Sequence, residues 1–230
     1  MDKVLSKIKL CYTKNMKIKR RKKENGYDDK AVLEMVLFCF FYYDRKIPID
    51  KINRLFPQSD KTWYRYVKEL ASLNLLPPNI QLLYFEGERC YTTKEDRDEL
   101  LGEVNESSII WYGDYSAVLD MTQADKHSNR LGRLAYMVTS YCEFYNCLLL
   151  FKEDVENGVY ADELEEQELT ISDCITAYED YCSAFDLSEK SFRRDLTVVM
   201  HAMAVYDSKW QEKLIAYQNK TLKIVKFIDD

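Results

Sequence analysis

Glycine, proline and histidine are all scarce in this chain, and each shortage narrows the class of protein it can be. Six glycines and four prolines among 230 residues leave few positions for the tight turns of a β-rich fold, so helix should predominate. Two histidines, and no glycine-rich phosphate loop, offer little material for acid–base or nucleotide chemistry. We therefore expect a mainly helical protein that is not an enzyme and holds no metal or cofactor.

Paired cysteines and long apolar runs are missing as well. The seven cysteines form an odd set without a Cys-x-x-Cys pair, and most of them lie in apolar helical stretches. Buried, reduced thiols in a cytoplasmic protein explain this pattern better than disulfides or a zinc site. The most apolar run, from Val36 to Tyr43, is too short to cross a bilayer, and the basic N-terminus lacks the apolar core of a signal peptide. No membrane association is expected.

Charge is distributed unevenly along the chain. A net charge of −6 argues against a protein that coats nucleic acid non-specifically, but a local cluster of positive charge still permits a specific binder. Residues 1–26 form such a cluster, with ten Lys or Arg against two acids. This basic arm could lie along DNA phosphates or be a solvated tail, and the sequence leaves both readings open.

What the chain does contain, in its C-terminal half, is a capped helix with two adjacent arginines in its first turns. Ser188 is a suitable N-cap residue, because its hydroxyl can accept from the free N–H groups of the following turn. The next apolar residues follow at i, i+4, i+7 and i+11, the spacing of one buried helical stripe: Phe192, Leu196, Val199 and Met203. The opposite face is polar and cationic, with Glu189, Lys190, Arg193, Arg194 and Thr197.

The same design occurs once more, earlier in the chain. Residues 59–67 align without a gap over residues 188–196, so that cap, acid, lysine, hydroxyl, aromatic, arginine and aliphatic positions coincide. In the first copy the buried stripe consists of Trp63, Val67 and Leu70. The outward positions are Asp60, Lys61, Tyr64, Arg65 and Lys68.

Both stretches resemble the recognition helix of the winged helix-turn-helix at the N-terminus of DeoR-type and WYL-type bacterial transcription regulators. A Val-Ser-x-x-Thr-Ile-Arg-Arg-Asp-Leu pattern is typical there, and the second copy departs from it at Leu187, Ser191 and Phe192. The first copy has Tyr64 and Tyr66 at the positions of the family's Arg and Asp. The resemblance implies two winged modules, and the chain is too short to add the effector domains of those families.

The first module should span residues 27–93. We expect a helix from Asp28 or Asp29 to about Tyr43, a short helix opening at Pro48 or Ile49, and a third helix reaching about Leu75. Strand, turn and strand over residues 81–92 then form the wing. The tip of this wing is acidic, and Arg89 would be its one basic contact.

The second module should span residues 129–230, after a connector of residues 94–128. It should open with a helix from Asn129 toward Phe151 and continue, after an acidic insertion at 153–168, with a helix from about Ser172 to Phe185. A β-hairpin over residues 213–228 would form a basic second wing. Because Arg193 and Arg194 would converge with this wing, we rank the second module as the stronger DNA reader.

The expected fold is therefore mainly α with small β-hairpin wings, an α+β protein of tandem winged helix-turn-helix modules. The expected function is that of a sequence-specific regulator of transcription, bacterial or phage in origin, that binds double-stranded DNA either alone or as a homodimer. The residues expected to contact DNA are Lys61, Thr62, Tyr64, Arg65, Lys68, Lys190, Ser191, Arg193, Arg194, Lys220 and Lys223.

One alternative competes with DNA binding. Winged helices also serve as protein-interaction modules, in which case the cationic faces would simply be solvated. The eight acids of residues 153–168 would then bind a basic partner protein. A solvated insertion, or a strip that mimics DNA and inhibits the protein itself, would account for the same acids.

Overall fold

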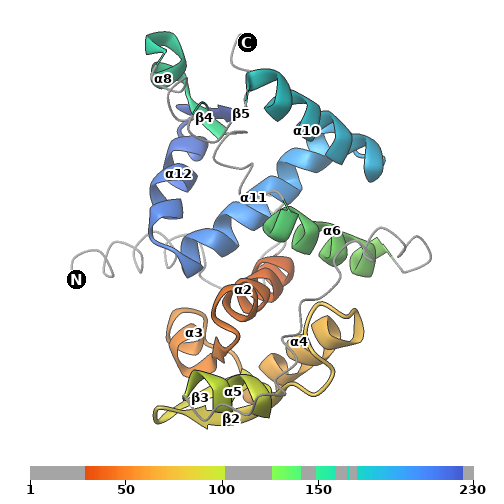
Figure 1. The fold of residues 1–230 in the computed structure, drawn as a ribbon, viewed down its shortest axis with the longest axis vertical. Coiled ribbons are helices and arrows are strands. Elements are labelled where there is room, and N and C mark those ends of the chain that lie inside the picture. The colour runs from red at the N-terminus through yellow and green to blue at the C-terminus, as the bar shows by residue number, and fades with distance from the viewer. Residues whose placement is uncertain (1–28, 102–125, 141–148, 159–164, 166–169, 225–230) are drawn as a thin grey trace.

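Two long helices, α2 (Asp29–Asp44) and α11 (Glu189–Tyr206), pack against each other at the centre of the molecule (Figure 1). The computed structural model describes residues 29–101, 126–140, 149–158, 165 and 170–224. Residues 31–41 of α2 are buried without interruption, in keeping with a sequence that is apolar on every side of the helix except at Glu34. The Cys39 thiol lies 3.6 Å from the Met203 sulfur, and the Tyr206 hydroxyl donates to Asp44 at 2.7 Å. The two halves of the chain therefore share one core.

The N-terminal half places three helices and a small sheet below this centre (Figure 1). Its elements after α2 are β1 (Ile47–Pro48), α3 (Ile49–Leu55), α4 (Asp60–Ser72), β2 (Gln81–Phe85), β3 (Glu88–Thr92) and α5 (Lys94–Leu100). The sheet is antiparallel, in the order β1-β3-β2. The strand between the first two helices thus pairs with the second strand of the hairpin that follows the third helix.

The β2–β3 hairpin confirms the strand, turn and strand expected over residues 81–92. Glu86 and Gly87 form its two-residue turn with φ values of 49° and 83°. Two consecutive positive φ angles match the right-handed twist of the flanking strands, and glycine adopts the second at no steric cost. Glu86 and Glu88 are exposed there, so the tip of the hairpin is acidic as expected.

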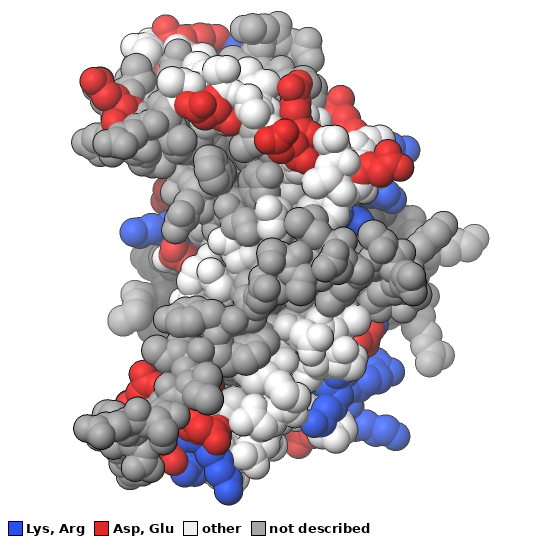
Figure 2. Space-filling view, turned by 45° about the vertical axis from the view of Figure 1, so that its right-hand side comes forward, with Lys and Arg blue, Asp and Glu red and all other residues white. Residues whose placement is uncertain are grey.

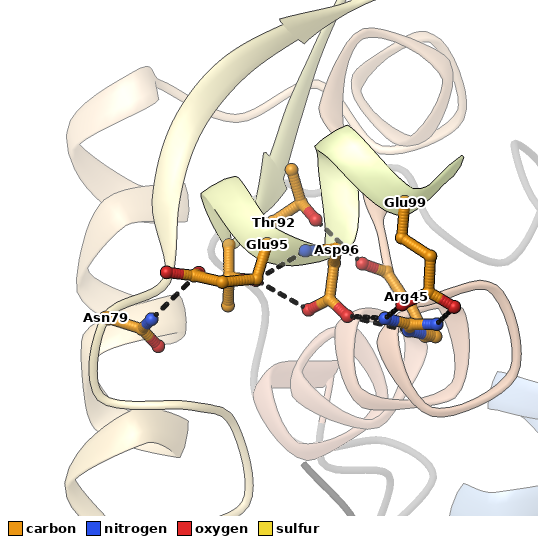
Figure 3. Close-up of polar contacts among 7 residues, drawn as sticks. Arg45, Asn79, Thr92, Glu95, Asp96 and Glu99 are labelled. Carbon is orange, nitrogen blue, oxygen red and sulfur yellow. Dashed lines mark hydrogen bonds and ion pairs between the residues drawn. The ribbon is translucent and has the colours of Figure 1, made fainter. Parts of the chain in front are cut away.

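A polar cluster fixes α5 to the end of α2 (Figure 3). Arg45 follows α2 and donates to both Asp96 and Glu99, with Glu99 oxygens at 2.8 and 2.9 Å. Thr92 of β3 donates to the Arg45 carbonyl at 2.9 Å, while Thr93 caps α5 by accepting from the Asp96 N–H at 3.0 Å. Because these groups are largely shielded from water, the cluster ties helix, sheet and α5 into one unit.

The C-terminal half surrounds α11 with shorter elements. They are α6 (Lys126–Ser140), β4 (Leu149–Phe151), α8 (Lys152–Asn157), α10 (Ile171–Ala184), α12 (Lys209–Gln218) and β5 (Leu222–Ile224). Strands β4 and β5 pair antiparallel, with Leu149 opposite Ile224 and Phe151 opposite Leu222. Here too a strand between the first and second helices pairs with a strand that follows the arginine-bearing helix.

Two expectations for this half are wrong. The hairpin predicted over residues 213–228 is absent, because residues 209–218 form α12 and β5 pairs with the distant β4. The buried positions Trp210 and Leu214 have helical spacing, which the alternation of residues 213–217 concealed. The helix expected to run from Asn129 toward Phe151 also fails at its end, since residues 149–151 are a strand.

The fold class expected from the sequence is confirmed at its coarser level: the chain is mainly helical, with small antiparallel strand pairings, compatible with α+β. The predicted helix from about Ser172 to Phe185 is confirmed as α10. The basic arm of residues 1–26 and most of the connector lie outside the described residues, as does much of the acidic insertion.

Candidate nucleic-acid interface

Both arginine-bearing helices begin with the cap that the sequence predicts. Ser59 accepts from the Thr62 N–H at 3.2 Å at the start of α4, and Ser188 accepts from the Ser191 N–H at 3.3 Å at the start of α11. The paired hydroxyls also meet, at 2.9 Å in the first copy and 3.1 Å in the second. Thr62 and Ser191 are therefore hydrogen-bonded to the cap residues, which leaves their hydroxyls with less capacity to bond DNA.

The predicted apolar stripes are buried in both helices. Trp63, Val67 and Leu70 line the inner face of α4, and the four stripe residues of α11 are buried likewise. In each copy the aromatic residue also contacts the preceding helix. The Trp63 indole donates to Asn53 of α3 at 3.0 Å, and the Phe192 ring packs edge-on against Tyr178 of α10 at 4.7 Å. The internal repeat thus extends from sequence to contacts.

One position shows this correspondence most clearly. Tyr66 of α4 and Asp195 of α11 occupy the same place in the alignment, and both face the first helix of their half. Lys30 of α2 lies over the Tyr66 ring at 5.9 Å, whereas Arg130 and Arg133 of α6 donate to Asp195 at 3.0 and 2.7 Å. A cation of the first helix meets this position in both copies, by a cation–π contact in one and by ion pairs in the other.

The outer face of α4 carries three cations in a row, which we call the α4 ridge: Lys61, Arg65 and Lys68. Their spacing of i, i+4 and i+7 places them on one side of the helix, and all three are exposed. Within the described part of the chain, no carboxylate forms an ion pair with them. Figure 2 shows basic side chains gathered at the lower right of its view, at the height of α4 in Figure 1. The ridge is thus available to an anionic partner.

An exposed apolar surface, the tyrosine patch, lies beside the α4 ridge and consists of Tyr64, Leu82 and Tyr84, which are 54%, 43% and 71% exposed. Leu82 and Tyr84 of β2 stand opposite Tyr91 and Arg89 of β3 in the sheet register. Arg89 in turn bonds Asp60, one turn before Tyr64, at 3.0 Å. Arg89 thus joins the hairpin that carries Leu82 and Tyr84 to the first turn of α4, the helix that carries Tyr64.

Arg89 is not the free basic contact that the sequence suggested. Its guanidinium donates to Asp50 at 2.8 and 3.0 Å and to Asp60 at 3.0 Å, so the side chain joins β3 to α3 and α4. Bonding to Arg89 lowers the pKa of Asp50. With Arg89 engaged and Glu86 exposed at the tip, the hairpin is unsuited to lie along phosphates.

The α11 residues that were predicted to contact DNA are less accessible than those of α4. Lys190 and Arg194 are exposed, and Arg194 lies 3.3 Å from the Ser191 hydroxyl. Arg193 donates to Glu189 at 2.7 Å and also interacts with Tyr217 of α12. Beyond Thr197 the helix enters the core, with six of the next seven residues buried. The major groove of a DNA duplex could therefore accommodate the first two turns of α11, but not the whole helix.

Lys220 and Lys223 do not lie on a hairpin wing, in contrast to the prediction. Lys220 is exposed at the turn after α12, with a φ of 63°, and Lys223 is half-buried on β5 opposite Leu150. A basic hairpin at this place was the reason to expect that the second module binds DNA more strongly than the first. The physical basis of that expectation is therefore lost.

Acidic residues concentrate at the other end of the molecule. The first residues of the acidic insertion form α8, where Glu153 and Glu156 are exposed, and Glu179 and Asp180 are exposed on α10. Figure 2 shows acidic side chains spread over the upper end of its view. One group of exposed acids therefore lies away from the α4 ridge, while Asp60, Glu86 and Glu88 are exposed in the half of the chain that carries the ridge.

Glu34 of α2 is a fully buried carboxyl behind α4. Lys30 lies 3.2 Å from it and 2.6 Å from Glu69 of α4. Burial raises the pKa of Glu34 to about 8, although Lys30 opposes the shift. The folded protein thus favours the protonated acid, and this contribution to stability is complete below the ordinary pKa of Glu and is lost as pH rises through 8.

Glu34→Gln should therefore stabilise the protein increasingly with pH, because glutamine cannot ionise. We expect its advantage in free energy of unfolding to grow from near zero at pH about 4 to about 5 kcal/mol at pH about 9. Urea unfolding across that range measures this advantage. Glu88→Gln, at an exposed pair with Arg54, is the matched control and should shift stability by less than about 0.5 kcal/mol throughout. A constant difference between Glu34→Gln and wild type would contradict the assignment.

Burial lowers the pKa of His201 to about 4, so this side chain is neutral near pH 7. No group of three or more potential metal ligands lies within the ranges that the structure describes. None of the helices described there is long and apolar enough to span a membrane.

Sequence reasoning missed several residues that build this surface. Arg130 and Arg133, which donate to Asp195, lie in a helix that was predicted without any role for these two side chains; their i, i+3 spacing was the available signal. Tyr84 and Leu82 were read simply as strand residues. Their alternation with the more buried Leu83 and Phe85 could have marked them as outward-facing.

Comparison of this chain with protein-family models, curated proteins and solved structures found no match.

Proposed function

We propose that this protein is a sequence-specific regulator of transcription that binds double-stranded DNA through α4. The observation that carries the proposal is the α4 ridge, three exposed cations on one helical face that form no ion pair with a described carboxylate. A helix of this length fits the major groove of B-DNA, where arginine and lysine contact phosphates and guanine edges. Tyr64 would lie in the groove beside them.

The order of elements supports a winged helix-turn-helix over residues 29–92. Helix, short strand, helix, helix and hairpin follow one another, with β1 completing the sheet beside β3. In such modules the third helix enters the groove while the first two support it. The burial of Trp63 against Asn53 of α3 provides that support here.

The second copy is proposed to act mainly as a scaffold. Its α6, α10 and α11 correspond in order to α2, α3 and α4 of the first copy. The second half of α11, however, is buried in the shared core, where α11 packs against α2. Arg194 and Lys190 remain exposed on its first two turns and would make auxiliary phosphate contacts. Cys39, Cys90, Cys174 and Cys182 form no disulfides, which is compatible with a cytoplasmic location.

Selection from a random duplex library tests the proposal. The purified full chain should enrich a defined sequence, and binding of that duplex should weaken steeply as salt rises, because each neutralised phosphate releases counterions. Failure to enrich any sequence at low salt, with a folded protein, would contradict it.

A protein-interaction module is the second candidate. The exposed carboxylates of α8 and α10 favour it, since they form an acidic end suited to a basic partner. Under this alternative the α4 ridge would be a solvated face, and alanine at its three positions would leave the function intact. Capture of a basic protein that the variant Glu179→Lys/Asp180→Lys loses, without any DNA enrichment, would favour this candidate.

A further inference from the structure

We infer that the tyrosine patch reads thymine, with Tyr64 contacting the C5-methyl group in the major groove. This inference rests on the proposed function and adds the class of sequence that the protein would select. Three large exposed side chains beside a cationic ridge require an explanation, because water is a poor partner for them. A duplex supplies both complements at once: phosphates for the ridge and methyl groups for the patch.

Tyr64 is exposed on α4 with a cation of the ridge next to its ring. Lys68, one turn further along α4, lies with its ammonium 5.8 Å from the Tyr64 ring centre. Arg65 leans the other way, with its guanidinium 5.3 Å from the Tyr66 ring centre. A phosphate bound by Lys68 would therefore lie next to the Tyr64 ring, while Arg65 would contact a different part of the backbone or a guanine edge.

The hairpin supplies the other side of the patch. Tyr84 stands opposite Arg89, and Arg89 bonds Asp50 of α3 and Asp60 of α4, so the strand that pairs with Tyr84 is tied to the start of α4. The acidic residues at the tip, Glu86 and Glu88, keep phosphates away from the end of the hairpin. The hairpin is thus better suited to apolar contact than to binding the backbone.

The major groove offers one apolar group among the four bases, the thymine methyl. Alignment strengthens the assignment to Tyr64, because the second copy carries Arg193 at that position and the first copy an aromatic ring. An arginine there would suit a guanine edge, whereas a tyrosine ring covers a methyl group. The two copies therefore differ in the chemistry of the base they could accommodate.

Deoxyuridine in place of thymidine tests the inference, since it removes the methyl group and leaves base pairing intact. The probe is the duplex recovered by selection, resynthesised with deoxyuridine at each thymidine in turn. Wild type should lose affinity about fourfold at one or two positions, the value expected for one buried methyl group. Tyr64→Phe should keep this sensitivity, and Tyr64→Ser should bind both duplexes equally.

Ile215→Ser, at an exposed apolar residue of α12, is the matched control and should retain the wild-type sensitivity. Equal binding of thymidine and deoxyuridine duplexes by wild type would overturn the inference while leaving the proposed function standing. Tighter binding of the single strand than of the duplex would overturn it as well, in favour of base stacking. Absence of any selected duplex would remove both the inference and the proposed function.

Discussion

Asp195→Ala is expected to lower the free energy of unfolding by about 4 kcal/mol, because it removes a buried carboxylate that accepts from two arginines. The Asp195 side chain is 2% exposed and lies 3.0 Å from Arg130 and 2.7 Å from Arg133. Without it, two guanidinium groups remain at the α6–α11 interface with their shared acceptor gone. Urea unfolding at neutral pH measures the loss.

Glu189→Ala provides the matched control for this prediction. It removes a carboxylate from the same helix, but one whose pair with Arg193 is about half-exposed, so the change should stay below about 0.5 kcal/mol. Asp195→Asn keeps the shape and should lose less than alanine does. A loss for Asp195→Ala as small as that for Glu189→Ala would show that the ion pairs contribute little, and that α6 is held by its apolar contacts alone.

The role of Asp195 also explains part of the sequence pattern itself. In the run Arg193-Arg194-Asp195-Leu196, the acid and the leucine point inward, and the arginines point toward solvent or a neighbouring side chain. The motif resembles a DNA-binding sequence, but two of its four residues, Asp195 and Leu196, stabilise the fold. The first copy shows the same division, with Tyr66 and Val67 inward and Tyr64 and Arg65 outward.

Local features of the fold were predictable because nearby residues determine them. The caps at Ser59 and Ser188, and the hairpin turn at Glu86-Gly87, each depend on a few consecutive residues. The apolar stripe of α4 was equally predictable, because apolar residues recur with a clear helical period in a helix that has one polar side.

Long-range features were not predictable from the same signals. Strand β5 pairs with β4, which precedes it by about seventy residues, so no local pattern could distinguish this pairing from a hairpin. The uniformly apolar sequence of α2 indicated burial but could not name α11 as its partner. The sequence therefore could not show that α11 is exposed over its first two turns and buried over most of the remainder.

The triple variant Lys61→Ala/Arg65→Ala/Lys68→Ala is expected to weaken binding of the selected duplex about 100-fold and to reduce the slope of log affinity against log salt by about 3. Each of the three exposed cations would release about one counterion on binding, and alanine preserves the helix. Binding measured by fluorescence anisotropy at several salt concentrations gives both quantities, and urea unfolding verifies that the variant is folded.

Arg193→Ala/Arg194→Ala is the comparison that separates the two helices. If α4 is the principal DNA-binding element, this double variant should weaken binding less than about 10-fold, because Arg193 is already paired with Glu189 and Arg194 would make an auxiliary contact. The opposite order, with the α11 double variant losing more affinity than the α4 triple variant, would return α11 to the role that its Arg-Arg-Asp-Leu sequence suggests. In that case the first two turns of α11 would have to reach the groove without a hairpin wing beside them, because the described residues that follow α11 form a helix and a strand paired with β4.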